Sequence, residues 1–95
     1  MTKGGYVVID LTKAGAFTSG TAKTVAGLYD RIKNPTKQAL LIQGLKVSTT
    51  EYPAFFALFT PVSTSYEATI KIGGATLDIL VSNASACTVT VTPDE

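Results

Sequence analysis

Apolar and polar residues alternate through the second half of the chain in the manner of β-strands. The clearest alternation covers residues 66–72, and it returns in residues 76–81 and 87–92. Successive side chains of a strand point to opposite faces, so a period of two predicts strands with one apolar face each. Gly73-Gly74 joins the first two of these strands, and a glycine pair permits the positive φ angles of a tight hairpin turn. This part of the chain is therefore expected to form an antiparallel meander.

Shorter apolar runs upstream predict further strands. Residues 6–11 form a β-branched apolar run that is typical of a strand covered on both faces. Residues 38–47 indicate another strand, with a bulge or turn at Gly44. A turn at residues 48–50 then leads into an aromatic strand over residues 51–60.

One segment changes to a helical period. Apolar residues recur at i, i+3, i+4 and i+7, with Ala22 one turn earlier, in the series Val25, Leu28, Tyr29 and Ile32. This spacing predicts a single amphipathic helix over about residues 21–33, capped by Ser19 or Thr21 and ended by Asn34-Pro35. Gly27 inside that helix suggests a close approach of its backbone to the sheet.

These elements predict an α+β fold. An N-terminal strand is followed by the helix at about 21–33, which packs on an antiparallel meander of four to five strands. The chain is short enough for a single domain over residues 1–95, in which residues 93–95 are a polar tail.

The amino-acid composition excludes several kinds of catalytic and metal-binding chemistry, but it says little about the fold. The chain has no histidine, and its acidic residues are scattered along predicted turns and solvent faces. Imidazole is the commonest general base and metal ligand, and metal sites need clustered ligands. We therefore predict no catalytic residue, no cofactor and no metal, and we expect a protein that is not an enzyme. The lone Cys87 cannot form an internal disulfide and fits a buried apolar position.

Charge argues against a nucleic-acid partner, and the length of the apolar runs argues against a membrane partner. Eight basic residues are balanced by seven acidic ones, whereas nucleic-acid binding needs a basic footprint. Arg31, Lys33 and Lys37 follow one another at the predicted end of the helix, where cations complement the exposed carbonyl groups. An anion site is the less favoured alternative. The longest apolar run, residues 52–59, is far shorter than the roughly 20 residues of a membrane helix.

The aromatic strand is the best candidate for a contact surface. Because neighbouring residues of a strand point oppositely, it carries aromatic groups on both faces, namely Tyr52, Phe55, Phe56 and Phe59. One interpretation is a central strand covered by the helix on one face and by loops on the other. The other is that a second protein chain covers the remaining face, because small monomers rarely expose large apolar patches. We take these four residues as the candidate subunit interface or the core beside it.

The order of the segments resembles a known family. Residues 6–12 (YVVIDLT), 17–21 (FTSGT), 25–32 (VAGLYDRI), 37–47 (KQALLIQGLKV) and 87–91 (CTVTV) are similar to short tailed-bacteriophage proteins called head fibre or capsid-decoration proteins. The resemblance covers nearly the whole chain and rests on a fold pattern. It implies a virion structural protein that is made in the host cytoplasm and sits on the capsid surface. Its implied partners are the phage capsid protein and itself, as a homo-oligomer of two or three copies.

Two other classes of function stay open at this point. The first is a small intracellular protein-binding or regulatory module that docks an enzyme through an open sheet face. The second is a small-molecule carrier, which requires an apolar cavity under the helix.

Overall fold

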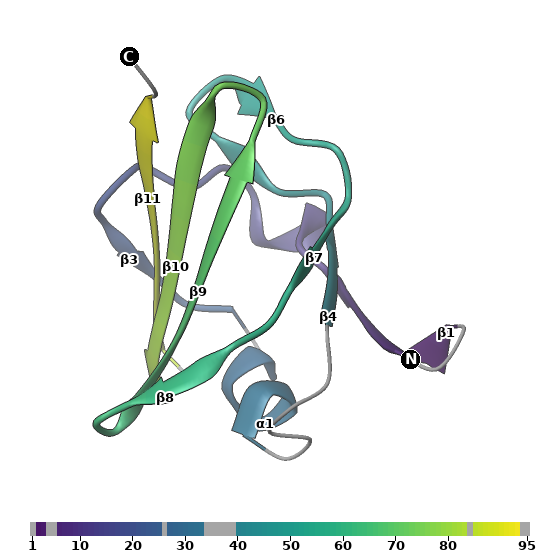
Figure 1. Ribbon diagram of the computed structural model, residues 1–95, viewed down its shortest axis with the longest axis vertical. Helices are drawn as coiled ribbons and strands as arrows, with labels where there is room; N and C mark the ends of the chain where they lie inside the picture. The colour runs from purple at the N-terminus through teal and green to yellow at the C-terminus, as the bar shows by residue number, and fades with distance from the viewer. Residues whose placement is uncertain (1, 4–5, 26, 34–39, 84, 94–95) are drawn as a thin grey trace.

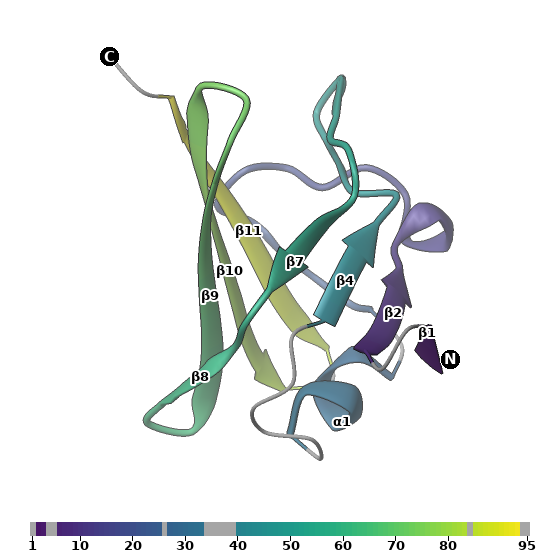
Figure 2. The same ribbon diagram turned by 45° about the vertical axis from the view of Figure 1, so that its right-hand side comes forward.

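Two β-sheets face each other in the computed structural model, which describes residues 2–3, 6–25, 27–33, 40–83 and 85–93 (Figures 1 and 2). The first sheet has the strand order β1-β2-β4-β7. Its strands are β1 (Thr2–Lys3), β2 (Tyr6–Asp10), β4 (Leu40–Gln43) and β7 (Phe55–Ala57). The second sheet has the order β3-β11-β10-β9-β8. Its strands are β3 (Ala22–Lys23), β8 (Thr60–Val62), β9 (Ser65–Ile72), β10 (Ala75–Asn83) and β11 (Ala86–Pro93).

The second sheet contains the meander that the alternation predicts. Strands β9, β10 and β11 pair antiparallel, and Gly73 and Gly74 make the first turn with φ angles of 60° and 82°. Strand β3 adds to the free side of β11 and extends the sheet. The loop before β3 is tied to the same strand, because Gly20 N donates to the carbonyl of Val89 at 3.0 Å.

The first sheet combines parallel and antiparallel pairs. Strand β2 runs parallel to β4, and β4 pairs antiparallel with β7. The β2–β4 ladder continues beyond the strand, since Leu11 N donates to the carbonyl of Gln43 at 2.8 Å. A short 3-10 helix, Thr12–Ala14, follows. A small hairpin of β5 (Lys46–Val47) and β6 (Thr50–Glu51) lies beside these sheets.

The core fills the space between the two sheets. Its buried residues form one cluster to which both sheets contribute, among them Phe17, Leu40, Ile42, Leu45, Leu77, Val81 and Val89. Phe17 is held there by the β5 strand, because its N–H donates to the Lys46 carbonyl and its carbonyl accepts from Ser48 N, both at 2.8 Å.

Among the described residues there is one α-helix, α1 (Leu28–Lys33), and it closes one end of the space between the sheets (Figure 2). Its Leu28 and Ile32 side chains are buried. Tyr29 meets Tyr66 of β9 edge to face, with ring centroids 5.9 Å apart.

The fold is largely β with one short α-helix, which is roughly compatible with the predicted α+β class. The predicted helix of 21–33 is wrong over its first half, because α1 begins at Leu28. Ala22–Lys23 pair with β11, and Gly27 has a φ angle of 77°, which an α-helix does not permit. A Cβ atom at Gly27 would meet nothing within 4 Å, so no close approach to the sheet explains that glycine. The predicted cap is also wrong, because Ser19 Oγ accepts a hydrogen bond from Val91 N at 2.9 Å.

The placement of the other strands differs in detail from the sequence expectation. The N-terminal strand lies in a different sheet from the meander, and the strand expected over 51–60 is divided into β6, β7 and the start of β8. Gly44 does lie at a turn, with a φ angle of 77°. Residues 38–39 and most of the proposed polar tail, 94–95, fall outside the described residues, and Pro93 ends β11.

Within the described ranges, no helical segment has the length and apolar character that spanning a bilayer requires.

Candidate interaction surface

The aromatic segment divides its side chains between the core and the surface. Phe55, Ala57 and Phe59 point inward, with Phe55 and Phe59 only 8% and 5% exposed. Phe56 and Leu58 alternate with them and are 54% and 56% exposed. The period of two through β7 therefore holds, and it gives this strand one face in the core and one apolar face at the surface.

An apolar row crosses the outer face of the first sheet and ends at this strand. The register places Val8 of β2 beside Leu41 of β4, and Leu41 beside Phe56 of β7. Val8 and Leu41 are half-buried, whereas Phe56 is exposed at the edge of the sheet. We call Val8, Leu41, Phe56 and Leu58 the outer apolar row.

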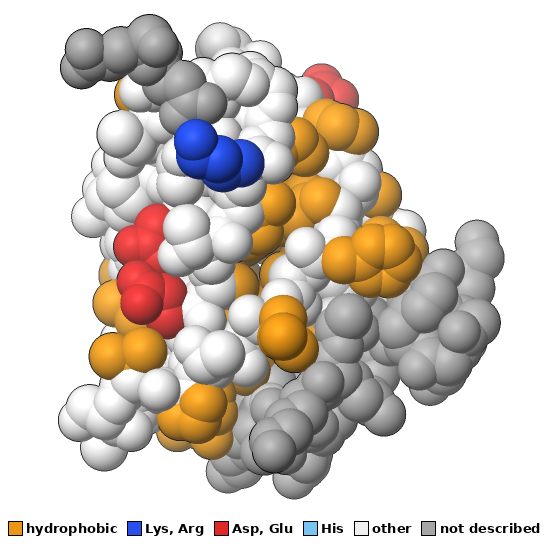
Figure 3. Space-filling view, in the orientation of Figure 1, with side chains coloured by type: hydrophobic (Ala, Val, Ile, Leu, Met, Phe, Trp, Pro, Cys, Tyr) orange, Lys and Arg blue, Asp and Glu red, His pale blue; other side chains and the backbone are white. Residues whose placement is uncertain are grey.

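One continuous stretch of chain borders both sheets on the same side. Residues 55–62 run from β7, an edge of the first sheet, into β8, an edge of the second. Val62 of β8 is 46% exposed. In Figure 3, hydrophobic side chains gather over β7 and in the hollow between β7 and β9. No charged residue occurs between Tyr52 and Tyr66, so this stretch of chain carries no charge of its own.

The four residues predicted for a subunit interface therefore lie in different places. Phe55 and Phe59 fill the core of a single chain, so their burial requires no second chain. Tyr52 is half-buried against that core, with its N–H donating to the Leu45 carbonyl at 3.0 Å. Phe56 is the member of the set that is exposed.

Sequence reasoning missed Leu58, Val62, Val8 and Leu41 as surface residues. The alternation of residues 55–59 already separates Phe56 and Leu58 from the other three. Two apolar faces look alike in sequence, however, and only the packing of the second sheet shows which one is outside.

The outer face of β9, β10 and β11 carries polar side chains apart from Leu80 and Ala86. Glu67 of β9 and Asp78 of β10 are diagonal neighbours, because Asp78 pairs with Thr69 and Leu80 with Glu67. Figure 3 shows acidic side chains gathered over these strands. A hydrogen bond with the Asp78 carboxyl group, together with its charge, raises the pKa of Glu67 above the usual value. Asp78 Oδ1 is buried and has no hydrogen-bond partner among the described residues.

The remaining titratable groups with a shifted pKa are Cys87 and Asp10, and they lie apart from Glu67. Burial raises the pKa of the Cys87 thiol to about 11, which keeps it protonated and unreactive. Asp10 Oδ1 accepts hydrogen bonds from Thr12 Oγ1 at 2.7 Å and Thr12 N at 2.9 Å, and these lower the pKa of Asp10. In the part of the chain that the structure describes, no three Cys, Asp or Glu residues gather as metal ligands.

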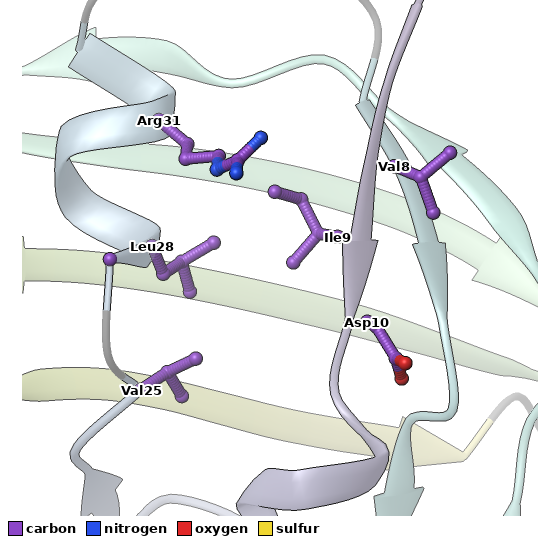
Figure 4. A pocket seen from close by; sticks show the side chains of 7 residues that line it. Val8, Ile9, Asp10, Val25, Leu28 and Arg31 are labelled. Carbon is purple, nitrogen blue, oxygen red and sulfur yellow. The ribbon is translucent and has the colours of Figure 1, made fainter. Parts of the chain in front are cut away.

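A shallow pocket lies between α1 and β2 (Figure 4). Its volume is about 240 Å³, and its walls include Ile9, Val25 and Leu28, with Arg31 extending over it. Pockets that enclose drug-sized ligands measure roughly 300–1,000 Å³, and this one is smaller. A larger hollow of about 380 Å³ beside Val25 is lined also by Asp10, Lys13 and Thr24, so it is not the apolar cavity that a small-molecule carrier requires. Of the basic series expected at the helix end, Arg31 is exposed, the Lys33 side chain is not described, and Lys37 lies outside the described residues.

Comparison of this chain with family models, with curated proteins and with solved structures finds no match in any of the three.

Proposed function

We propose that this chain is a non-catalytic structural protein of a phage particle, a head fibre or capsid-decoration protein. It acts through protein contacts, both with the capsid protein and with its own copies. The observation that carries the proposal is the outer apolar row, which crosses the first sheet and ends at β7, the last strand in the order of that sheet.

The exposed apolar groups support a contact function. Phe56, Leu58 and Val62 lie along one short stretch that borders both sheets. Apolar surface is stabilised when it leaves water, and small proteins that expose it in one place usually have a partner there. The absence of charge from Tyr52 to Tyr66 favours a partner surface that is also apolar.

The resemblance of the chain to phage head fibre and capsid-decoration proteins supports the location. A capsid presents many identical sites, and a protein that decorates it needs a stable β-domain and contact surfaces. Such a role requires no reaction centre. We therefore place the protein on the capsid surface, after synthesis in the host cytoplasm.

Analysis of the particle tests this proposal directly. Mass spectrometry of purified phage should find the chain in a fixed ratio to the capsid protein. Particles grown without its gene should take up the purified protein and carry it through a density gradient. Because the candidate surface is uncharged, binding should change little between about 0.1 and 1 M salt, a range over which the Debye length falls from about 10 to 3 Å.

Two results would overturn the proposal. One is the absence of the chain from purified particles at any fixed ratio. The other is failure of particles that lack it to bind the purified protein. Stoichiometric binding to a purified cellular enzyme in place of the particle would favour the small regulatory module.

A further inference from the structure

We infer that the Asp78 carboxyl group changes its partner when Glu67 gains or loses a proton, which makes the outer face of β9 and β10 a pH-sensitive switch. With a proton on Glu67, the two carboxyl groups are hydrogen-bonded across the strands. Without that proton, the Asp78 carboxylate turns to the Lys71 ammonium group. The inference goes beyond the proposed contact function, because it concerns the second sheet and not the outer apolar row.

The register of the sheet gives Asp78 two diagonal neighbours of different charge. Asp78 pairs with Thr69 of β9, so the next residues on the same face of that strand are Glu67 on one side and Lys71 on the other. Diagonal neighbours of an antiparallel pair lie about 7–8 Å apart, a distance that long side chains can span. A turn of the Asp78 side chain toward one of these neighbours moves it away from the other.

The other side chains around this site are uncharged in the strands that the structure describes. Strand β8, which borders β9, consists of Thr60, Pro61 and Val62. Strand β11, which borders β10 on its other side, places threonines on this face, among them Thr90 directly beside Asp78. Glu67, Asp78 and Lys71 therefore set the charge of this face of the described strands.

The structure shows Asp78 with Glu67 as its partner. The two carboxyl groups are hydrogen-bonded, and because an ionised carboxylate only accepts hydrogen bonds, one of the two must hold a proton. The bond and the charge of Asp78 raise the pKa of Glu67, so this proton is held more tightly than usual. Asp78 Oδ1 is buried and has no hydrogen-bond partner among the described residues, so this arrangement leaves one acceptor unsatisfied.

Loss of the proton reverses the preference of Asp78. Two carboxylates at hydrogen-bond distance repel each other, whereas a lysine and a carboxylate form a charge-assisted hydrogen bond. The three groups together are neutral with the proton and carry one negative charge without it. The outer face of β9 and β10 thus changes its charge with pH, whereas the outer apolar row contains no titratable side chain.

A double-mutant cycle on the purified chain tests the change of partner. NMR carboxyl titration measures the pKa of Glu67 in each variant. Lys71→Met should raise this pKa, because the Asp78 carboxylate then has no cation to turn to. In the Asp78→Asn background, Lys71→Met should leave the pKa of Glu67 unchanged. Lys46→Met is the matched control, since it removes an exposed lysine from the β5–β6 hairpin, and it should change nothing in either background.

The side-chain signals of Lys71 report its contact with Asp78. In the native chain, the ε-methylene chemical shifts of Lys71 should change over the same pH range as the Glu67 carboxyl group. In Glu67→Gln they should not change there, because the amide group of this variant donates to Asp78 at every pH. The signals of Lys23 serve as an internal control, since its Nζ lies 6.0 Å from the centre of the Phe17 ring and away from this face. Far-UV circular dichroism confirms that each variant is folded.

Two results would overturn the inference. If Lys71→Met raises the pKa of Glu67 equally with and without the Asp78 carboxyl group, Lys71 acts on Glu67 by its charge alone. If the Lys71 signals do not follow the titration of Glu67, Asp78 keeps its partner. Neither measurement involves a particle or a second copy of the chain, so either outcome leaves the proposed function to be judged by its own experiment.

Discussion

Alanine substitution of two neighbouring aromatic residues tests the division of the aromatic segment between core and surface. Phe59 is 5% exposed and belongs to the buried cluster, whereas Phe56 is 54% exposed. Truncating a fully buried phenylalanine costs about 3–5 kcal/mol, because apolar burial is lost and a cavity remains. Phe56 is about half buried, so its truncation should remove about half of the ~1.5–3 kcal/mol that full burial of such a side chain contributes, or about 1 kcal/mol.

The difference is large compared with the stability of a chain of this size. At about 0.05–0.15 kcal/mol per residue, the 95 residues give a free energy of unfolding of roughly 5–14 kcal/mol. Phe59→Ala should lower the Tm by roughly 12 °C or more, since each kcal/mol shifts it by about 4–8 °C in a domain of this size. Phe56→Ala should lower the Tm by less than about 8 °C.

Urea and thermal unfolding, followed by far-UV circular dichroism, measure both variants. The protein should be kept at a few micromolar so that self-association does not contribute to stability. If Phe56→Ala destabilises the chain as much as Phe59→Ala does, the assignment of these residues to surface and core is wrong. A cost below about 1 kcal/mol for Phe59→Ala would contradict it equally.

Three further substitutions or modifications test other features. Gly44→Ala should lower the free energy of unfolding by more than the ~1–2 kcal/mol that a positive φ angle alone costs, because the added Cβ would lie 2.9 Å from Thr12 N. Chemical denaturation measures the change in the free energy of unfolding. A smaller decrease refutes the close approach of Gly44 to Thr12. Asp78→Asn should lower the pKa of Glu67 in an NMR carboxyl titration, and an unchanged pKa would show that the two groups do not interact. In the native chain, the raised pKa of Glu67 contributes stability that is fully present below the pKa of the unfolded chain, about 4.5. This contribution is lost as the pH rises through the higher pKa of the folded chain. Asp78→Asn should therefore weaken the dependence of stability on pH. Cys87 should resist alkylation at pH 8 until the chain unfolds, and rapid modification of the folded protein would contradict its burial.

The second half of the fold was predictable because its pattern is local. Each hairpin strand from Ser65 to Pro93 pairs with its neighbour in sequence, so alternation and the Gly73-Gly74 turn are enough to predict the meander. The parallel pairing of β2 with β4 brings together segments about 30 residues apart, and nothing in either segment alone indicates it.

The helix start was mispredicted for a related reason. Val25, Leu28 and Ile32 are all buried, so the helical spacing did identify core positions. Val25 reaches the core from the segment before the helix, and a buried residue of a loop satisfies the same spacing as a helical one. The pairing of Ala22–Lys23 with β11 depends on residues far along the chain and left no local signal.

The candidate surface was predictable only in part. The sequence shows that both faces of the aromatic segment are apolar, and it includes Phe56 among the candidates. It does not show that Phe55 and Phe59 face the second sheet, because that depends on how the two sheets pack. Nor does it show that Val8 and Leu41 line up with Phe56, because that depends on the register across β4.

The pairing of β3 with β11 also determines when the chain can finish folding during its synthesis. Lys23 pairs with Cys87, 64 residues later, and β11 separates β3 from the rest of the second sheet. At about 5–20 residues per second, β3 waits roughly 3–13 s after its own synthesis for this partner. During that time the apolar residues of the N-terminal half cannot be covered by the completed second sheet. The nascent chain should therefore stay open to chaperones until β11 has emerged from the ribosome.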